Sequence, residues 1–146
     1  MARPVILSNG SLTVALDNFG QVRDFYFPYV GTENHVSQRI SAWKIGLFVD
    51  NRINWIDNSD WDFTHRGQET PRYFTENSVP HPIGQTFAKN KTINIAISIE
   101  DFVDNKLNVF SRNFHVINLG GDSRQVKLFA YQVFRIGEAN DGHDTA

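Results

Sequence analysis

The 146-residue chain contains no cysteine, one methionine and five prolines. Without cysteine it can form neither a disulfide framework nor a thiolate metal site. No apolar run approaches the length of a membrane-spanning helix, and the apolar stretch near the first residue is too short for the core of a secretory signal. These absences predict a cytoplasmic protein without a membrane partner.

The chain also lacks an excess of charge of either sign. Its 14 basic and 16 acidic residues give a formal net charge of −2, and no basic block is present. The chain therefore lacks the clustered positive charge that attracts nucleic acid. The five histidines are scattered without the spacing of a zinc-binding pair. We expect no nucleic-acid partner, no metal and no cofactor.

Extended patterns separated by turn residues recur along the chain, and no segment keeps a helical period. Leu12, Val14 and Leu16 alternate with smaller or polar residues, and the alternation of isoleucines from Ile93 to Ile99 is the cleanest in the sequence. Aromatic residues reach 13%, which suits the space between two packed sheets. The sequence predicts an all-β fold, an antiparallel β-sandwich that forms a single domain over residues 1–146.

Turn chemistry and apolar pattern divide the rest of the chain. Asp50 to Arg52 reads as a tight turn between two strands, and Leu119 to Ser123 reads as a glycine-rich hairpin connection. Arg124 to Ile136 is apolar on both faces, which predicts a central strand covered on both sides. Asp57 to Gln85 contains several glycines and prolines and predicts a long irregular excursion.

One loop concentrates aromatic, turn-forming and polar residues directly after an alternating strand. It runs Tyr26-Phe-Pro-Tyr-Val-Gly-Thr-Glu-Asn-His35-Val36. Pro28 cannot donate to a sheet ladder and Gly31 permits a sharp bend, so the strand should end and the loop should project from a sheet edge. Loops held on a rigid scaffold often carry function.

This loop and the strands before it carry a family resemblance. The stretch from Leu7-Ser-Asn-Gly through Leu16-Asp-Asn-Phe-Gly20 to Phe27-Pro-Tyr-Val-Gly-Thr-Glu-Asn-His35 resembles the start of the bacterial and archaeal glucoamylase-like enzymes of glycoside hydrolase family 15. The resemblance covers about the first third of the chain. It implies the N-terminal super-sandwich domain of that family, incomplete at its C-terminus, with the catalytic helical barrel and its two glutamates absent.

By this resemblance the chain is the non-catalytic N-terminal domain of a hydrolase that cleaves α-glucosidic bonds in oligo- or polysaccharides. Its partner would be the C-terminal catalytic domain of the same polypeptide, together with an α-glucan oligosaccharide where a loop rims the active site. Two alternatives are a stand-alone carbohydrate-binding module and a structural interaction domain without sugar contact.

Two groups of residues are candidates for contact with sugar or with a neighbouring domain. Sugar rings stack on aromatic faces, while polar side chains bind their hydroxyls. The loop residues that either rim the substrate or seal a domain interface are Tyr29, Glu33, Asn34 and His35. The candidates for sugar stacking in the irregular excursion are Trp61, His65 and Arg66.

Acidic pairs offer weaker signals. Glycoside hydrolysis needs two carboxylates held across the scissile bond, and Asp60 with Asp62, or Glu100 with Asp101, are the adjacent pairs available. Exposed turns and strand ends explain both pairs more simply. Asp57 to Asp62 is rich in oxygen ligands for calcium but lacks the glycine and the distant glutamate of a calcium loop. We therefore predict no catalytic residue in this chain.

Overall fold

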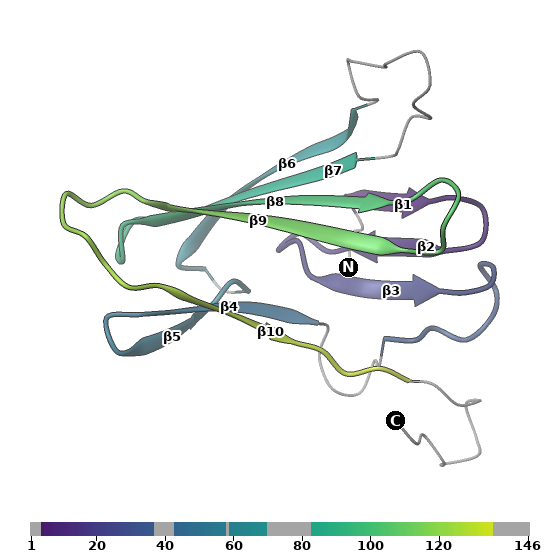
Figure 1. Cartoon of the computed structure of the whole chain (residues 1–146), viewed down its shortest axis with the longest axis horizontal. Helices are drawn as coiled ribbons and strands as arrows, with labels where there is room; N and C mark the ends of the chain where they lie inside the picture. Colours follow the sequence, from purple (N-terminus) through teal and green to yellow (C-terminus); the bar gives the residue numbers. More distant parts are fainter. Residues whose placement is uncertain (1–3, 37–42, 58, 70–82, 136–146) are drawn as a thin grey trace.

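The computed structural model describes residues 4–36, 43–57, 59–69 and 83–135, with the backbone alone described at 66–69 and 83. Every regular element in these residues is a β-strand, and each strand pairing is antiparallel. The ten strands form three sheets (Figure 1). The predicted antiparallel β-sandwich is confirmed.

The first sheet is an antiparallel meander of β1 (Val5–Ser8), β2 (Thr13–Leu16) and β3 (Val22–Tyr26). Asp17 shapes the turn between β2 and β3, because its Oδ1 atom accepts hydrogen bonds from the backbone N–H groups of Phe19 and Gln21. Gly20 closes this turn with a φ of +69°, a conformation that side chains disfavour.

The second sheet has the order β10 (Lys127–Tyr131), β4 (Lys44–Val49), β5 (Arg52–Trp55). The predicted tight turn between β4 and β5 is present. Asp50 and Asn51 both have positive φ, at 49° and 59°, which is typical of the type I′ turn that matches strand twist.

The third sheet has the order β6 (Trp61–Glu69), β7 (Ile83–Asn90), β8 (Ile95–Val103), β9 (Phe110–Asn118). The prediction that Asp57 to Gln85 is irregular is wrong at both ends. Residues 61–66 pair in register with 85–90, so the two ends of this segment lie on paired antiparallel strands, and 70–82 lie outside the described residues.

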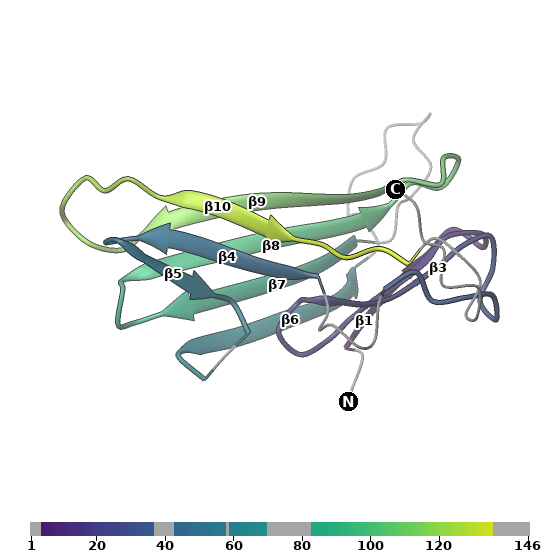
Figure 2. The same cartoon turned by 90° about the horizontal axis from the view of Figure 1, so that it is seen from below.

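Two apolar cores lie between the layers. The larger sheet packs on β4 and on Ile56, which follows β5. The other buried residues of this core include Ile45, Leu47, Trp61, Ile97 and Ile99. A second core joins the β1–β3 sheet to the ends of β4 and β8. Figure 2 shows β4, β5 and β10 lying across one face of the sheet formed by β6 to β9.

The last strand differs from its sequence prediction. Within the described residues, β10 pairs only with β4, every residue of β10 is exposed, and β9 pairs with β8. Residues 119–123 therefore carry the chain from one sheet to the other, so the predicted hairpin and the predicted central strand are both wrong. Apolar residues on both faces of this segment predict a buried strand, but in the described part of the chain no layer covers β10.

Among the described residues, no helix is long and apolar enough to cross a membrane.

Candidate functional site

The loop after β3 folds back on itself through hydrogen bonds to its own backbone. The Thr32 hydroxyl donates to the carbonyl oxygens of Phe27 and Tyr29, at 3.1 and 2.7 Å. Gly31 has a φ of +109°, which only glycine adopts without strain, so the bend depends on it. The loop is thus an ordered turn.

Asn34 uses both ends of its amide to hold the loop against β3. Its Oδ1 atom accepts from the N–H groups of Phe25 and Val36, at 3.0 and 3.1 Å. Its Nδ2 atom donates to the carbonyl oxygen of Arg23 and to the carboxylate of Asp24, at 3.3 and 2.9 Å. These four bonds engage the amide in the domain's own structure.

His35 and Glu33 tie the loop to the segment that follows β10. The His35 Nδ1 atom lies 2.8 Å from the carbonyl oxygen of Arg135, and its Nε2 atom lies 3.2 Å from that of Phe27. Glu33 pairs with the Arg135 guanidinium at 2.6 Å. Both acceptors of His35 are carbonyl oxygens, so a neutral ring can donate to only one of them at a time.

The apolar residues of the loop point the other way. Phe27, Tyr29 and Val30 are 42%, 60% and 64% exposed. We refer to these three residues as the apolar tip. Because the polar residues engage the chain itself while the apolar tip faces outward, the loop has the chemistry of a docking element.

An aromatic groove lies between the open edges of the two layers, on the β9 and β10 sides. It has a volume of about 390 Å³ and is lined by residues that include Phe25, Trp43, Phe110, Arg112, Phe114 and Phe134. The Trp43 and Phe134 rings lie 4.5 Å apart between centroids, and the indole N–H donates to the carbonyl oxygen of Val133. Phe134, half-exposed, pairs with Val36, so the groove borders the loop.

A buried ion pair forms part of the groove wall. Arg112 lies between the rings of Phe110 and Phe114, with its guanidinium carbon 5.8 and 5.6 Å from their centroids. It pairs with Asp101, whose pKa burial raises above the usual range while the Arg112 charge and hydrogen bond oppose that shift. Arg112 also donates to the carbonyl oxygen of Gly20 at 2.6 Å. The guanidinium is thus committed to the protein itself.

The second group of sequence candidates does not form one site. Trp61 is buried in the larger core, so its ring faces are not available for sugar stacking in this structure. Both ring nitrogens of His65 have partners, the carbonyl oxygen of Asn18 at 2.6 Å and the Thr86 hydroxyl at 3.2 Å. The side chain of Arg66 lies outside the described residues.

The acidic pairs are separated or engaged with bases. Glu100 faces outward and bonds to Gln85, whereas its neighbour Asp101 faces the core, because adjacent strand residues point to opposite faces. Asp57 and Asp62 form ion pairs with lysines, at 2.7 and 3.1 Å. No group of three or more metal-binding side chains occurs within the described parts of the chain.

Comparison with known proteins found a relative of this chain. An uncharacterized glycosyl hydrolase of Methanocaldococcus jannaschii is 28% identical over 133 residues. The chain resembles part of a glycosyl hydrolase. The match covers 91% of this chain and 19% of that relative. No family model and no solved structure matches the chain.

Sequence reasoning located the loop but selected mainly its polar residues. Of the apolar tip it named Tyr29 alone, although Phe27 and Val30 flank the same turn. The sequence did contain a signal for them: apolar residues stand close to Gly31 in a turn, where side chains commonly face solvent. The groove was missed, because Phe25, Trp43 and Phe134 come together only through the packing of separate strands.

Proposed function

We propose that this chain is the non-catalytic N-terminal β-sandwich of a glucoamylase-like glycosyl hydrolase, of the family 15 type, that cleaves α-glucosidic bonds. The observation that carries the proposal is the similarity of nearly the whole chain to a small part of a glycosyl hydrolase. The opening motif from Leu7 to His35 supports the finer assignment.

In this proposal the partner is the catalytic domain of the same polypeptide, and the docking surface is the apolar tip together with the aromatic groove. Exposed apolar patches rimmed by polar residues are typical of interaction sites. The Glu33 and His35 contacts to Arg135 hold the tip beside the groove rim, so one partner can cover both. The position of Glu100 and Asp101 on opposite faces of β8 supports a non-catalytic role.

The first experiment reads the coding sequence downstream of residue 146 and assays the purified chain. We expect a continuing reading frame that encodes a helical-repeat region with spaced glutamates. We also expect no hydrolysis of maltose, maltooligosaccharides, dextran or trehalose by the 146-residue chain. A stop codon at this point would favour the stand-alone carbohydrate-binding module, and turnover abolished by Asp62→Asn would contradict a non-catalytic role.

A second experiment tests the docking surface in the longer polypeptide. Val30→Ser should lower the free energy of unfolding by about 1.5 kcal/mol, because the apolar side chain would lose its burial against the partner domain. Ile53→Ser is the matched control, since Ile53 is 52% exposed on β5 at the opposite end of the molecule (Figure 1).

Thermal melting and kcat/KM on maltooligosaccharides separate the two roles of the loop. A docking role predicts lower stability with kcat/KM of the folded enzyme unchanged. If the loop instead rims the substrate, Tyr29→Ala should lower kcat/KM while melting stays the same. His35→Ala does not separate the two roles, because the loss of its contacts to Arg135 and Phe27 lowers stability in either case. If Val30→Ser and Ile53→Ser lower the unfolding free energy equally, the loop is not part of the domain interface.

A further inference from the structure

The outer face of the third sheet, opposite the core, carries an aromatic residue within a polar row. Thr64 pairs with Phe87, Phe87 with Ser98, and Ser98 with His115, so these four residues lie side by side across β6 to β9. Neighbouring strands are about 4.8 Å apart, so the row spans roughly 14 Å. An elongated ligand can therefore lie across the strands.

A second polar row runs beside the first. Gln85, Glu100 and Asn113 are cross-strand neighbours, each two residues away from the first row on β7, β8 and β9. The Gln85 amide donates to the Glu100 carboxylate at 3.0 Å, and this pair is exposed to solvent. The amide and the carboxylate are thus held in position, and both remain accessible from outside.

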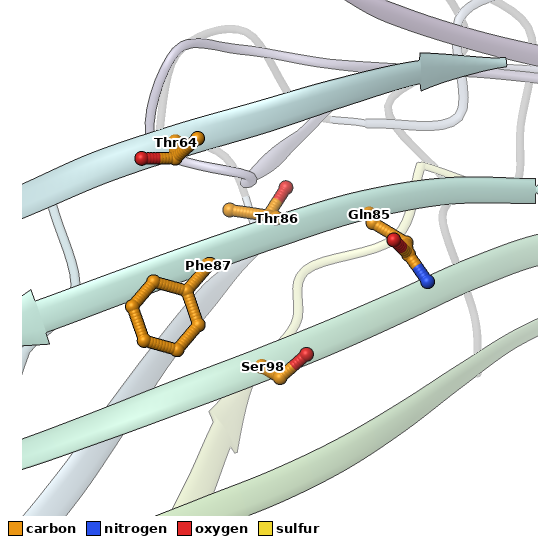
Figure 3. A pocket seen from close by; sticks show the side chains of 5 residues that line it. All are labelled: Thr64, Gln85, Thr86, Phe87 and Ser98. Carbon is orange, nitrogen blue, oxygen red and sulfur yellow. The ribbon is translucent and has the colours of Figure 1, made fainter. Parts of the chain in front are cut away.

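A shallow hollow of about 270 Å³ opens beside the Phe87 ring. Its lining residues are Thr64, Gln85, Thr86, Phe87 and Ser98. Figure 3 shows the Phe87 ring and the side chains of Gln85 and Ser98 around this opening, with β4 and β10 on the far side of the sheet. The volume of the hollow lies just below the range of drug-sized pockets, about 300 to 1,000 Å³. It therefore suits one small polar unit of a ligand rather than a whole drug-sized molecule.

The chemistry of this face favours a neutral sugar over other ligands. A protein partner would need roughly 800 Å² of surface on each side, yet Phe87 is the one large apolar side chain in the two rows. Asp62 and Lys89 are exposed cross-strand neighbours of opposite charge on the other side of the row, and Asp62 forms its ion pair with Lys91. Sugars combine C–H faces that stack on a ring with hydroxyls that bind amide, hydroxyl and carboxylate groups.

We propose that the outer face of β6 to β9 around Phe87 binds one unit of a neutral saccharide chain. Phe87 supplies the stacking surface, Gln85 and Glu100 bind hydroxyl groups on one side, and Thr64 and Ser98 bind them along the row. The site is separate from the docking surface, which belongs to the loop after β3 and to the groove between the layers. This proposal rests on the proposed function only in one respect, the choice of an α-glucan as the first saccharide to test.

The test is a saccharide titration of the isotope-labelled 146-residue chain, followed by NMR. Maltotriose, cellotriose and laminaritriose serve as the saccharides, up to concentrations of about 10 mM, which would nearly saturate a site with a dissociation constant of about 1 mM. We expect saturable shifts at the backbone amides around Phe87 and Ser98 with at least one of them. Binding of cellotriose or laminaritriose without maltotriose would support the site while counting against an α-glucan function.

Two substitutions with a matched control test the named residues. Phe87→Ala should weaken binding by about tenfold, equivalent to about 1.4 kcal/mol, and Ser98→Ala by a smaller factor. Phe129→Ala removes a ring of similar exposure, 42% against 39%, from the other sheet and should leave the affinity unchanged. Circular dichroism checks the fold of each variant.

Three results would overturn the proposal. The first is the absence of a saturable shift with every saccharide. The second is equal affinity in Phe87→Ala and the unmodified chain, and the third is a set of shifts confined to the loop around Tyr29.

Discussion

Asp101 and Arg112 face each other across β8 and β9 as a buried, two-pronged ion pair. The guanidinium Nε and Nη2 atoms lie 2.6 and 3.2 Å from the two carboxylate oxygens. The exposed fractions of the two side chains are 0% for Asp101 and 8% for Arg112. Because Arg112 also bonds to Gly20, this pair links the larger sheet to the turn between β2 and β3.

Removal of the base alone should be costly. Arg112→Met leaves the Asp101 carboxyl group buried without its partner, which typically costs about 3 to 5 kcal/mol of unfolding free energy. Urea denaturation measures this loss. The double variant Asp101→Leu with Arg112→Met should recover most of it, because it leaves no buried charge. A single-variant cost below about 1 kcal/mol would show that water or neighbouring groups already solvate the pair.

The raised pKa of Asp101 predicts a pH dependence of stability. Above its ordinary value of 3.8, the unfolded chain has released this proton while the folded chain still holds it. The stabilisation linked to this proton is therefore complete below that value and is lost as the pH rises through the folded pKa. Relative to Asp101→Asn, the unmodified chain should lose stability as the pH is raised above the ordinary value of 3.8.

Denaturant unfolding at several pH values measures that difference. Asp62→Asn, which removes an exposed carboxylate, is the control. A difference between the unmodified chain and Asp101→Asn that stays flat as the pH rises would mean that Arg112 outweighs the effect of burial.

The amide of Asn34 should matter for stability. Asn34→Ala deprives the N–H groups of Phe25 and Val36 of their acceptor and should cost about 2 kcal/mol of unfolding free energy. Asn113→Ala on the exposed face of β9 is the matched control and should change the stability by less than about 0.5 kcal/mol. Equal melting temperatures for the two variants would contradict a structural role for Asn34.

Gly84 marks a close approach between β7 and β1. A Cβ atom at this position would overlap a methyl carbon of Val5, so Gly84→Ala should destabilise the fold by about 1 to 3 kcal/mol. Gly121→Ala meets no atom within 4 Å and is the control. Val5→Ala added to Gly84→Ala should restore part of the loss, and failure to do so would place the strain elsewhere.

Local signals predicted much of the fold. The isoleucine alternation predicted β8, and Asp50 and Asn51 predicted the turn that joins β4 to β5. The pairing of β6 with β7 was missed because Gly84 was read as a breaker, whereas it allows the approach of Val5. A glycine can either interrupt a strand or allow another strand to approach closely, and only the packing of the neighbouring strand shows which of the two applies.

The sequence by itself determined the antiparallel class, the turns and the position of the loop after β3, since these depend on alternation and backbone preference within short segments. Tertiary structure decided which side chains of that loop face the chain and which face solvent. Asn34 and His35 turn inward because backbone groups of Phe25, Phe27 and Arg135 lie within hydrogen-bonding distance there, and buried polar groups require partners. The edge position of β10 and the polar row around Phe87 likewise depend on pairings between distant strands, which a local pattern does not encode.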